Sequence, residues 1–148
     1  MAVLQDKSFE ELKEYLVGEG ERPFRAEQIF KGLSSGRRIS EITDVSKDLR
    51  AKLCAAYEDK AIEIIGEKTS VKDGTIKYLF RLSDGNVIEG VLMKYKYGNT
   101  QCVSTQVGCR MRCAFCASGI GGLVRNLTAG EILAQVALVN AVNGGTLE

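Results

Sequence analysis

The chain has 148 residues, 45% of them hydrophobic and 26% charged, and its formal net charge is +1. This length suits one ordinary domain or two small ones, and the composition is that of a folded chain, which excludes a disordered one. No run approaches the roughly 20 apolar residues that cross a membrane, and residues 1–11 lack the apolar segment of a secretory signal. We therefore expect a cytoplasmic protein with no membrane partner.

Residues 1–60 are predicted to form a small helical module. Ser8-Phe-Glu-Glu11 has the pattern of a capping box that opens a first helix, and Gly18 and Gly20 end it. Pro23 precedes a second helix and Ser46 opens a third. The inward-facing side chains of these two helices are expected to be Ala26, Ile29, Phe30, Leu33, Leu49, Leu53, Cys54 and Tyr57.

Residues 61–98 are predicted to form antiparallel strands. Runs of β-forming residues at 62–67, 75–82 and 86–94 are separated by Asp73-Gly74 and Asp84-Gly85. Asp-Gly between two such runs is a strong hairpin signal.

Residues 99–148 are predicted to form one βα unit. Residues 100–106 are expected to be a single strand, and a loop with Gly119, Gly121 and Gly122 follows the cysteines. Thr128-Ala-Gly-Glu131 is a second capping box and opens a helix. Because one such unit cannot cover both faces of its strand, we expect its partners to be missing or to lie beyond residue 148.

Four of the five cysteines, Cys102, Cys109, Cys113 and Cys116, lie close together in a chain with no secretory signal. Such a cluster indicates metal binding or catalysis, since disulfides belong to oxidising compartments. Cysteines at the spacing of Cys109-x-x-x-Cys113-x-x-Cys116 can hold three corners of a cubane iron–sulfur cluster and leave the fourth iron open to a small molecule. In radical enzymes that molecule is S-adenosylmethionine, from which an electron of the cluster releases a carbon radical.

Two alternatives remain for these cysteines. The four together could form an all-thiolate zinc site, although the gap between Cys102 and Cys109 is longer than is usual for zinc. Chance spacing in a cysteine-rich stretch is the other alternative. Sites that combine cysteine and histidine are excluded, as is histidine acid–base catalysis, because the chain has no histidine.

Basic side chains without acidic ones occupy residues 93–130. A positive field of this kind suits a phosphate backbone or an anionic cofactor, and a solvated basic surface is the plainer interpretation. The residues are Lys94, Lys96, Arg110, Arg112 and Arg125.

The stretch Thr100-Gln-Cys-Val-Ser-Thr-Gln-Val-Gly-Cys-Arg-Met-Arg-Cys-Ala-Phe-Cys-Ala-Ser, continued by Gly119-Ile-Gly-Gly-Leu-Val-Arg-Asn-Leu-Thr128, resembles the RlmN/Cfr family of radical S-adenosylmethionine RNA methyltransferases. Pro23-Phe-Arg-Ala-Glu-Gln-Ile-Phe30 is a weaker match. Gln106-Val-Gly108 looks closer to the RlmN branch than to the Cfr branch. The resemblance implies an α/β fold in which residues 99–148 begin an incomplete TIM-like partial barrel.

The resemblance also implies an activity. The RlmN branch methylates carbon 2 of an adenine in 23S ribosomal RNA and in tRNA through a methyl-cysteine, whereas the Cfr branch methylates carbon 8. The implied cofactors are one [4Fe-4S] cluster and S-adenosylmethionine. The implied partners are ribosomal RNA, tRNA and an electron donor such as flavodoxin, and we expect a monomer.

Site roles follow from the same resemblance. Cys109, Cys113 and Cys116 would be the cluster ligands, and Phe115, before the last ligand, is assigned to cofactor binding. Cys102 aligns with the cysteine that resolves the covalent adduct between enzyme and RNA, and Glu89 with the acidic base. Without the resemblance, Glu89 is an ordinary outward-facing strand residue and Cys102 a half-buried strand cysteine. Cys54 is interpreted as a core residue.

No cysteine follows Cys116, so the methyl-carrying cysteine of the family is missing. We therefore expect the sequence to be an N-terminal piece that does not methylate RNA alone and holds a cluster poorly. A non-catalytic alternative is that residues 1–60 bind RNA helices. The residues that would do so are Arg22, Arg25, Lys31, Arg37 and Arg38.

Overall fold

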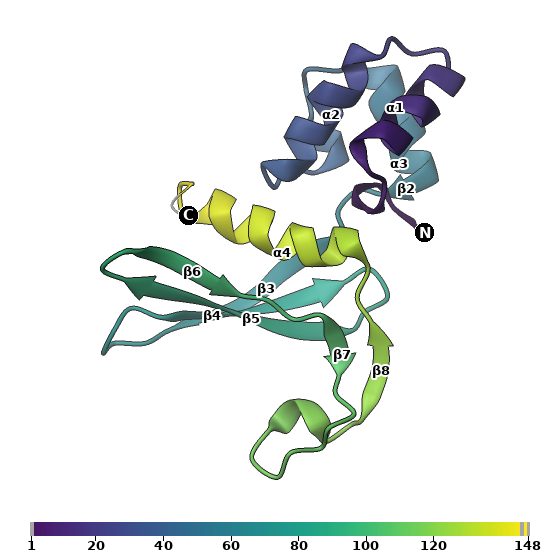
Figure 1. Ribbon diagram of the computed structural model, residues 1–148. Helices are drawn as coiled ribbons and strands as arrows, with labels where there is room; N and C mark the ends of the chain where they lie inside the picture. The colour runs from purple at the N-terminus through teal and green to yellow at the C-terminus, as the bar shows by residue number, and fades with distance from the viewer. Residues whose placement is uncertain (1, 146, 148) are drawn as a thin grey trace.

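The computed structural model describes residues 2–145 and 147. It consists of a helical module, a four-stranded sheet with one helix packed on it, and a two-stranded arm that projects from the sheet (Figure 1). The helices are α1 (Phe9–Gly18), α2 (Phe24–Ser34), α3 (Lys47–Ala56) and α4 (Ala129–Val142). The strands are β1 (Ala2–Val3), β2 (Tyr57–Glu58), β3 (Ile62–Thr69), β4 (Ile76–Leu82), β5 (Val87–Tyr95), β6 (Gly98–Cys102), β7 (Gln106–Gly108) and β8 (Leu123–Asn126).

The helical module contains the three predicted helices at the predicted places. At the start of α1, the Ser8 hydroxyl accepts from the amide of Glu11 at 3.3 Å, and the Glu11 carboxylate accepts from the amide of Ser8 at 2.7 Å. Ser46 caps α3 by accepting from the amide of Leu49. The module has its own core, formed by Leu4, Leu12, Leu16, Ala26, Ile29, Leu33, Ile39, Ile42, Val45, Leu49 and Leu53.

Two side chains of the module differ from expectation. Phe30 was expected to face inward but is 40% exposed, because α2 turns it to the rim, where it meets the ring of Phe9 edge-on. Cys54 was expected in the core and packs against it, but is only half-buried, and its thiol lies 3.5 Å from a carboxylate oxygen of Asp59. Burial, with Asp59 beside it, raises the pKa of the Cys54 thiol.

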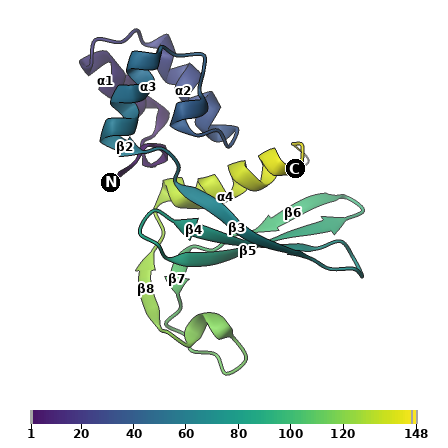
Figure 2. The same cartoon turned by 180° about the vertical axis from the view of Figure 1, so that it is seen from behind.

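Strands β3, β4, β5 and β6 form one antiparallel sheet in that order. The predicted hairpins are confirmed: Asp73 and Asp84 each accept, through the side chain, the amide two residues further on, which stabilises the turns. Helix α4 covers one face of the sheet and lies between it and the helical module, as Figure 2 also shows. The core between sheet and helix includes Tyr78, Phe80, Leu82, Ile88, Leu92, Ala134 and Val139.

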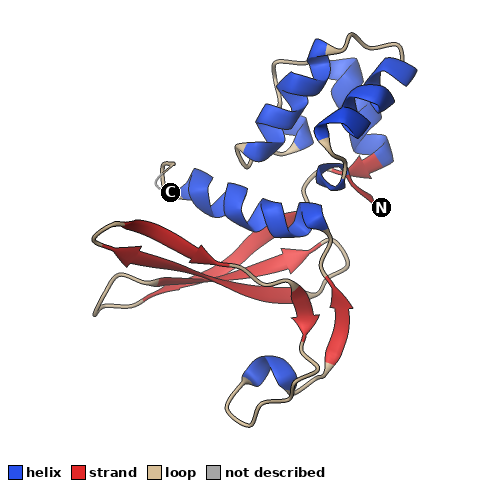
Figure 3. Ribbon diagram, viewed as in Figure 1, coloured by secondary structure: helices blue, strands red, loops and turns tan. Residues whose placement is uncertain are grey.

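Residues 100–106 were expected to be a single strand, and this prediction is wrong. Strand β6 ends at Cys102 and pairs with β5, whereas β7 begins at Gln106 and pairs with β8 (Figure 3). The chain bends at Ser104 because the side chain of Gln135, on α4, forms hydrogen bonds with both the amide and the carbonyl of Ser104. Strand β8 was not foreseen, so the cysteine loop joins two antiparallel strands before α4 begins.

The structure confirms the α/β class, with a helical module followed by hairpins and then a strand–helix segment. Within residues 2–145 and 147, no helix has the length and apolar character required to span a bilayer.

A pair of adjacent residues on α1 tests the core of the helical module. Leu16 is fully buried, whereas its neighbour Val17 is 49% exposed. We expect Leu16→Ala to lower the free energy of unfolding by about 2 to 5 kcal/mol, because it leaves a cavity. Val17→Ala should change it by less than about 0.5 kcal/mol. Urea unfolding followed by circular dichroism measures both, and equal effects would contradict the placement of α1.

Candidate iron–sulfur site

The three cysteines of the motif lie at the end of a projecting arm, residues 106–126, which we call the cysteine arm. Strands β7 and β8 pair through Gln106 with Asn126 and Val107 with Arg125. At the base of the arm the amide of Leu127 donates to the carbonyl of Thr105 at 2.9 Å. The two strands therefore carry the loop between them away from the sheet (Figure 1).

A glycine forms the neck of the cysteine arm. The amide of Cys109 donates to the carbonyl oxygen of Gly122 at 3.1 Å. Gly108, with a φ of +74°, crosses so close to Gly122 that an added Cβ would lie 1.9 Å from that same oxygen. Only glycine fits there, because any side chain would collide with backbone.

The loop beyond the neck is held by backbone turns. The amide of Cys116 donates to the carbonyl of Cys113 at 3.0 Å, and that of Gly119 to the carbonyl of Cys116 at 3.3 Å. The amide of Met111 points to the sulfur of Cys109 at 3.5 Å. Cys113 is exposed, and Cys109 and Cys116 are half-buried, so none of the three cysteines is fully enclosed by the protein.

The donor set of this loop fits an iron–sulfur cluster by its chemistry. Thiolates are the usual cluster ligands, and amide hydrogen bonds to their sulfurs, such as the one from Met111, are a common feature of such sites. Within the described residues, no three cysteine or carboxylate side chains already converge on one metal position. The loop borders an open cleft of about 600 Å³ that includes Cys113, Phe115 and Cys116 in its lining. Phe115 itself is 93% exposed.

Glu89 lies on the sheet face opposite α4, and its side chain is about half exposed. Its carboxylate oxygen Oε1 is 2.7 Å from the ammonium of Lys77 on β4. Glu89, on β5, and Cys109, which directly follows β7, line the same cleft, of about 510 Å³, and Ser104 also lines it. The structure therefore places the predicted base and one of the predicted cluster ligands in the lining of one cleft.

Cys102 lies on the same sheet face as Glu89. It pairs with Val91, which is two residues from Glu89 on β5, so the side chains of all three point to one side. Cys102 is exposed rather than half-buried. It does not line either of the two clefts that contain the cluster cysteines.

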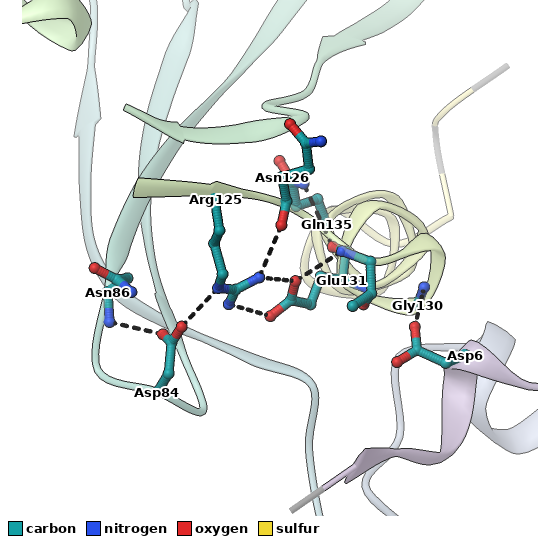
Figure 4. A network of polar contacts seen from close by, with 9 residues as sticks. Asp6, Asp84, Asn86, Arg125, Asn126, Gly130, Glu131 and Gln135 are labelled. Carbon is teal, nitrogen blue, oxygen red and sulfur yellow. Dashed lines mark hydrogen bonds and ion pairs between the residues drawn. The ribbon is translucent and has the colours of Figure 1, made fainter. Parts of the chain in front are cut away.

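Arg125 on β8 joins the cysteine arm to both the sheet and α4 (Figure 4). Its guanidinium donates to both carboxylate oxygens of Glu131, each at 2.8 Å, and to Asp84 at 2.7 Å. Glu131 is 2% exposed and also accepts the amide of Thr128 in the predicted capping box. Arg125 is thus engaged by two acids and adds no free positive charge to the surface.

These contacts shift the pKa values of the three groups. The hydrogen bond from Arg125 lowers the pKa of Asp84 to about 2 and also lowers the pKa of the Glu131 carboxyl. The pKa of Arg125 is raised by Glu131 first and Asp84 second. All three groups are therefore charged at neutral pH.

Gln135 on α4 fixes the other strand of the arm. Its side chain is fully buried; the amide nitrogen donates to the carbonyl of Ser104 at 2.9 Å, and the oxygen accepts from the Ser104 amide at 3.0 Å. The hydroxyl of Ser104 donates in turn to the carbonyl of Glu89 at 2.7 Å. Gln135 thereby sets where β7 departs from the sheet beside Glu89.

Besides Glu131 and Gln135, a third residue of α4, Gly130, forms a contact that holds the start of the helix. The amide of Gly130 donates to a carboxylate oxygen of Asp6 at 2.8 Å, which links α4 to the N-terminal segment (Figure 4). A Cβ on Gly130 would lie 2.8 Å from the backbone of that segment, so the approach requires glycine. Sequence patterns gave no signal for Asp6 or Gln135, because their partners are distant in the chain.

Comparisons with known proteins show what the chain is similar to. Residues 3–58 match the family model of the ribosomal RNA large subunit methyltransferase N-terminal domain. A probable dual-specificity RNA methyltransferase RlmN of a Thermoanaerobacter species is 48% identical over 144 residues, which are 95% of this chain and 42% of the relative. The same-named protein of Bacillus subtilis is 53% identical over 136 residues, or 89% of this chain and 37% of the relative.

A solved structure extends the similarity to the fold. The crystal structure of a radical SAM methyltransferase from Sphaerobacter thermophilus superposes with a TM-score of 0.88 at 41% identity. The match covers 99% of this chain and 45% of that one. The chain therefore spans about two fifths of the length of the curated relatives and a little less than half of this structural neighbour.

The Arg125 contacts predict a stability difference between two arginines. Arg125→Ala leaves the buried Glu131 carboxylate without its cation and should lower the free energy of unfolding by about 2 to 3 kcal/mol. Arg81→Ala, which removes an exposed pair with Glu63, should cost at most about 1 kcal/mol. Urea unfolding at neutral pH compares the two variants, and equal losses would contradict the anchoring role of Arg125.

The same pair gives a pH dependence. A carboxyl whose folded pKa is depressed stabilises the fold above its unfolded pKa and loses that contribution as the pH falls through the folded value. For Asp84 the loss should run from about pH 4 to about pH 2, and Glu131 should add to it in the same direction. The Arg125→Ala variant should lose less stability across this range than the wild type. An unchanged acid titration would exclude these carboxylates as its source.

Proposed function

We propose that the chain is the N-terminal part of a radical S-adenosylmethionine enzyme. The reason is that it belongs to the RlmN family of RNA methyltransferases over the part that it spans. The proposed reaction is methylation of carbon 2 of an adenine in 23S ribosomal RNA and in tRNA. The observation that carries the proposal is the fixed cysteine arm, whose first cysteine shares a cleft with Glu89.

Three thiolates of the arm would hold the cofactor. Cys109, Cys113 and Cys116 are the proposed ligands of three irons of a [4Fe-4S] cluster, and Phe115 would pack against the cofactor bound there. The cluster, when bound, supplies the electron that cleaves S-adenosylmethionine. Gly108 and the turn at Cys113 set the path of the loop that bears the ligands.

Glu89 is the proposed general base. Lys77 binds its Oε1 atom at 2.7 Å and thereby orients the carboxylate. The second oxygen, Oε2, is the atom that we assign to removal of the proton from the adenine carbon. The carbonyl of Glu89 is fixed by Ser104, so the backbone beneath the base is held by the same contacts that place β7.

Cys102 is the proposed resolving cysteine. Cys102 is exposed and lies on the sheet face that also carries Glu89. The RNA adduct of the proposed reaction would form over this face. The proposed reaction also needs a methyl-carrying cysteine, a role that we assign to none of the five cysteines of this sequence. We further propose that the complete protein acts as a monomer and takes electrons from a donor such as flavodoxin.

Cluster assembly tests the ligand assignment. Although the chain alone is expected to hold a cluster poorly, anaerobic reconstitution excludes oxygen, so with iron and sulfide it should give a reducible cluster, seen by visible absorption and by EPR after reduction. Cys113→Ala should abolish it, because three thiolates are needed. Cys54→Ala is the matched control and should retain it, since Cys54 lies in the helical module. Tight zinc binding without a cluster, or a cluster that survives Cys113→Ala, would contradict the proposal.

The neck of the arm provides a second test, which leaves all three cysteines in place. Gly108→Ala should strongly reduce the iron and sulfide bound per chain, because its Cβ would collide with the carbonyl of Gly122. Gly121→Ala introduces the same methyl group into open space and should bind iron as the wild type does. Iron and sulfide analysis after reconstitution compares them, and equal contents would show that the neck does not place the ligands.

A further inference from the structure

Two hairpin turns meet at the end of the sheet that lies away from the cysteine arm (Figure 1). One joins β3 to β4 and the other joins β5 to β6. They are neighbours, since a Cβ on Gly74 would lie 3.5 Å from the side chain of Lys94. We call residues 70–75 and 94–98 the hairpin edge.

The hairpin edge exposes a pair of stacked tyrosines. The rings of Tyr95 and Tyr97 are 5.0 Å apart between centroids and only 8° from parallel. Tyr95 is 46% exposed and Tyr97 is 73% exposed. Two aromatic rings held flat against each other at a hairpin tip present a broad π face to solvent, which a monomeric protein gains little by exposing.

The charge around the tyrosines is positive. Lys72, Lys94 and Lys96 are exposed, and within residues 2–145 and 147 no ion pair engages them. Asp73, the acid between them, is turned into its own hairpin, where it accepts from the amide of Thr75 at 3.0 Å. Glu67, further along β3, pairs with Tyr78 on the side that α4 covers.

We propose that the hairpin edge binds single-stranded RNA, with a base stacked on the tyrosine pair and phosphates held by Lys94, Lys96 and Lys72. Exposed aromatic faces beside lysines are the usual platform for single-stranded nucleic acid, because every base has a π face and every linkage a negative charge. This inference rests on the proposed function for the choice of RNA. An acidic peptide would use the lysines and leave the ring faces unused.

The position of the hairpin edge defines its task. It lies at the opposite end of the sheet from the cysteine arm (Figure 1), while Glu89 and Cys102 lie on the strands between them. The RNA segment held at the edge is therefore a different one from the adenine placed in the cleft. Its role is to anchor the substrate, not to take part in the chemistry.

Fluorescence anisotropy with a labelled oligouridine of about 12 nucleotides tests the proposal on this chain. Tyr95→Ala/Tyr97→Ala should weaken binding by about fivefold or more, the loss expected for one stacked base. Tyr95→Phe/Tyr97→Phe keeps both rings and should bind as the wild type does. Circular dichroism checks folding, and Tyr97→Ala alone serves if the double alanine variant unfolds.

The lysines are tested against a matched control. Lys94→Gln/Lys96→Gln should weaken binding and reduce the slope of log affinity against log salt by about 1 to 2. Lys47→Gln/Lys52→Gln makes the same charge change at exposed positions of α3 and should leave the slope nearly unchanged.

Several results would overturn the proposal. The first is an absence of RNA binding at low salt. The second is an equal RNA affinity of the wild type and of the variant with both tyrosines changed to alanine. The third is a lysine variant whose affinity and salt slope do not differ from those of its control. Loss with the lysine variant alone would point to an acidic partner that does not stack. Reconstitution of the iron–sulfur cluster in the same variants separates the two claims. A chain that forms the cluster but does not bind RNA overturns this inference and leaves the proposed function intact. A chain that binds RNA but forms no cluster overturns the proposed function and leaves the RNA site intact.

Discussion

Two buried polar side chains on α4, Glu131 and Gln135, fix the two strands of the cysteine arm to the rest of the molecule. Glu131 binds the guanidinium of Arg125 on β8. Gln135 forms hydrogen bonds with the amide and the carbonyl of Ser104, just before β7. Buried polar groups are costly unless they are paired, so these contacts leave little freedom in the position of either strand. The helix that covers the sheet therefore also sets the direction of the arm.

The remaining geometry of the site follows from this constraint. Because β7 and β8 are both held at the base, their loop is closed by the neck at Gly108, by short backbone turns and by the contact of the Met111 amide with the Cys109 sulfur. The anchoring at Ser104 reaches Glu89 through one further hydrogen bond, so the proposed base and the arm share a common support. Stiffness at the base and an open loop at the tip suit a site that must present three thiols to a large inorganic cofactor.

The parts of the fold that could be predicted from the sequence are those set by nearby residues. The capping boxes at Ser8 and Thr128 satisfy helix amides three residues away, and the Asp-Gly turns satisfy their own backbone. The bend at Ser104 could not be predicted, because its cause lies 31 residues further along the chain. In the sequence, Arg125 has the pattern of a basic surface residue, because nothing local reveals its partner Asp84, which is 41 residues away.

The candidate site divides in the same way. The spacing of Cys109, Cys113 and Cys116 indicates cluster chemistry by itself, since it depends on local reach alone. The assignments of Glu89 and Cys102 rest on resemblance, because a strand glutamate and a strand cysteine have no distinctive local pattern. What the fold adds is their common sheet face and the cleft that joins Glu89 to Cys109.

Amide hydrogen exchange of the wild-type chain and a Gln135→Ala variant tests most directly whether α4 anchors the arm. In the wild type, the amides of Ser104 and Leu127 should exchange slowly and that of Phe115 rapidly. Gln135→Ala should speed the exchange of Ser104 and leave Leu79, in the middle of the sheet, unchanged. Leu133→Ala, at a position of α4 that is 61% exposed, should alter neither. A Ser104 amide that exchanges as fast as Phe115 in the wild type, or that is indifferent to Gln135→Ala, would contradict the account.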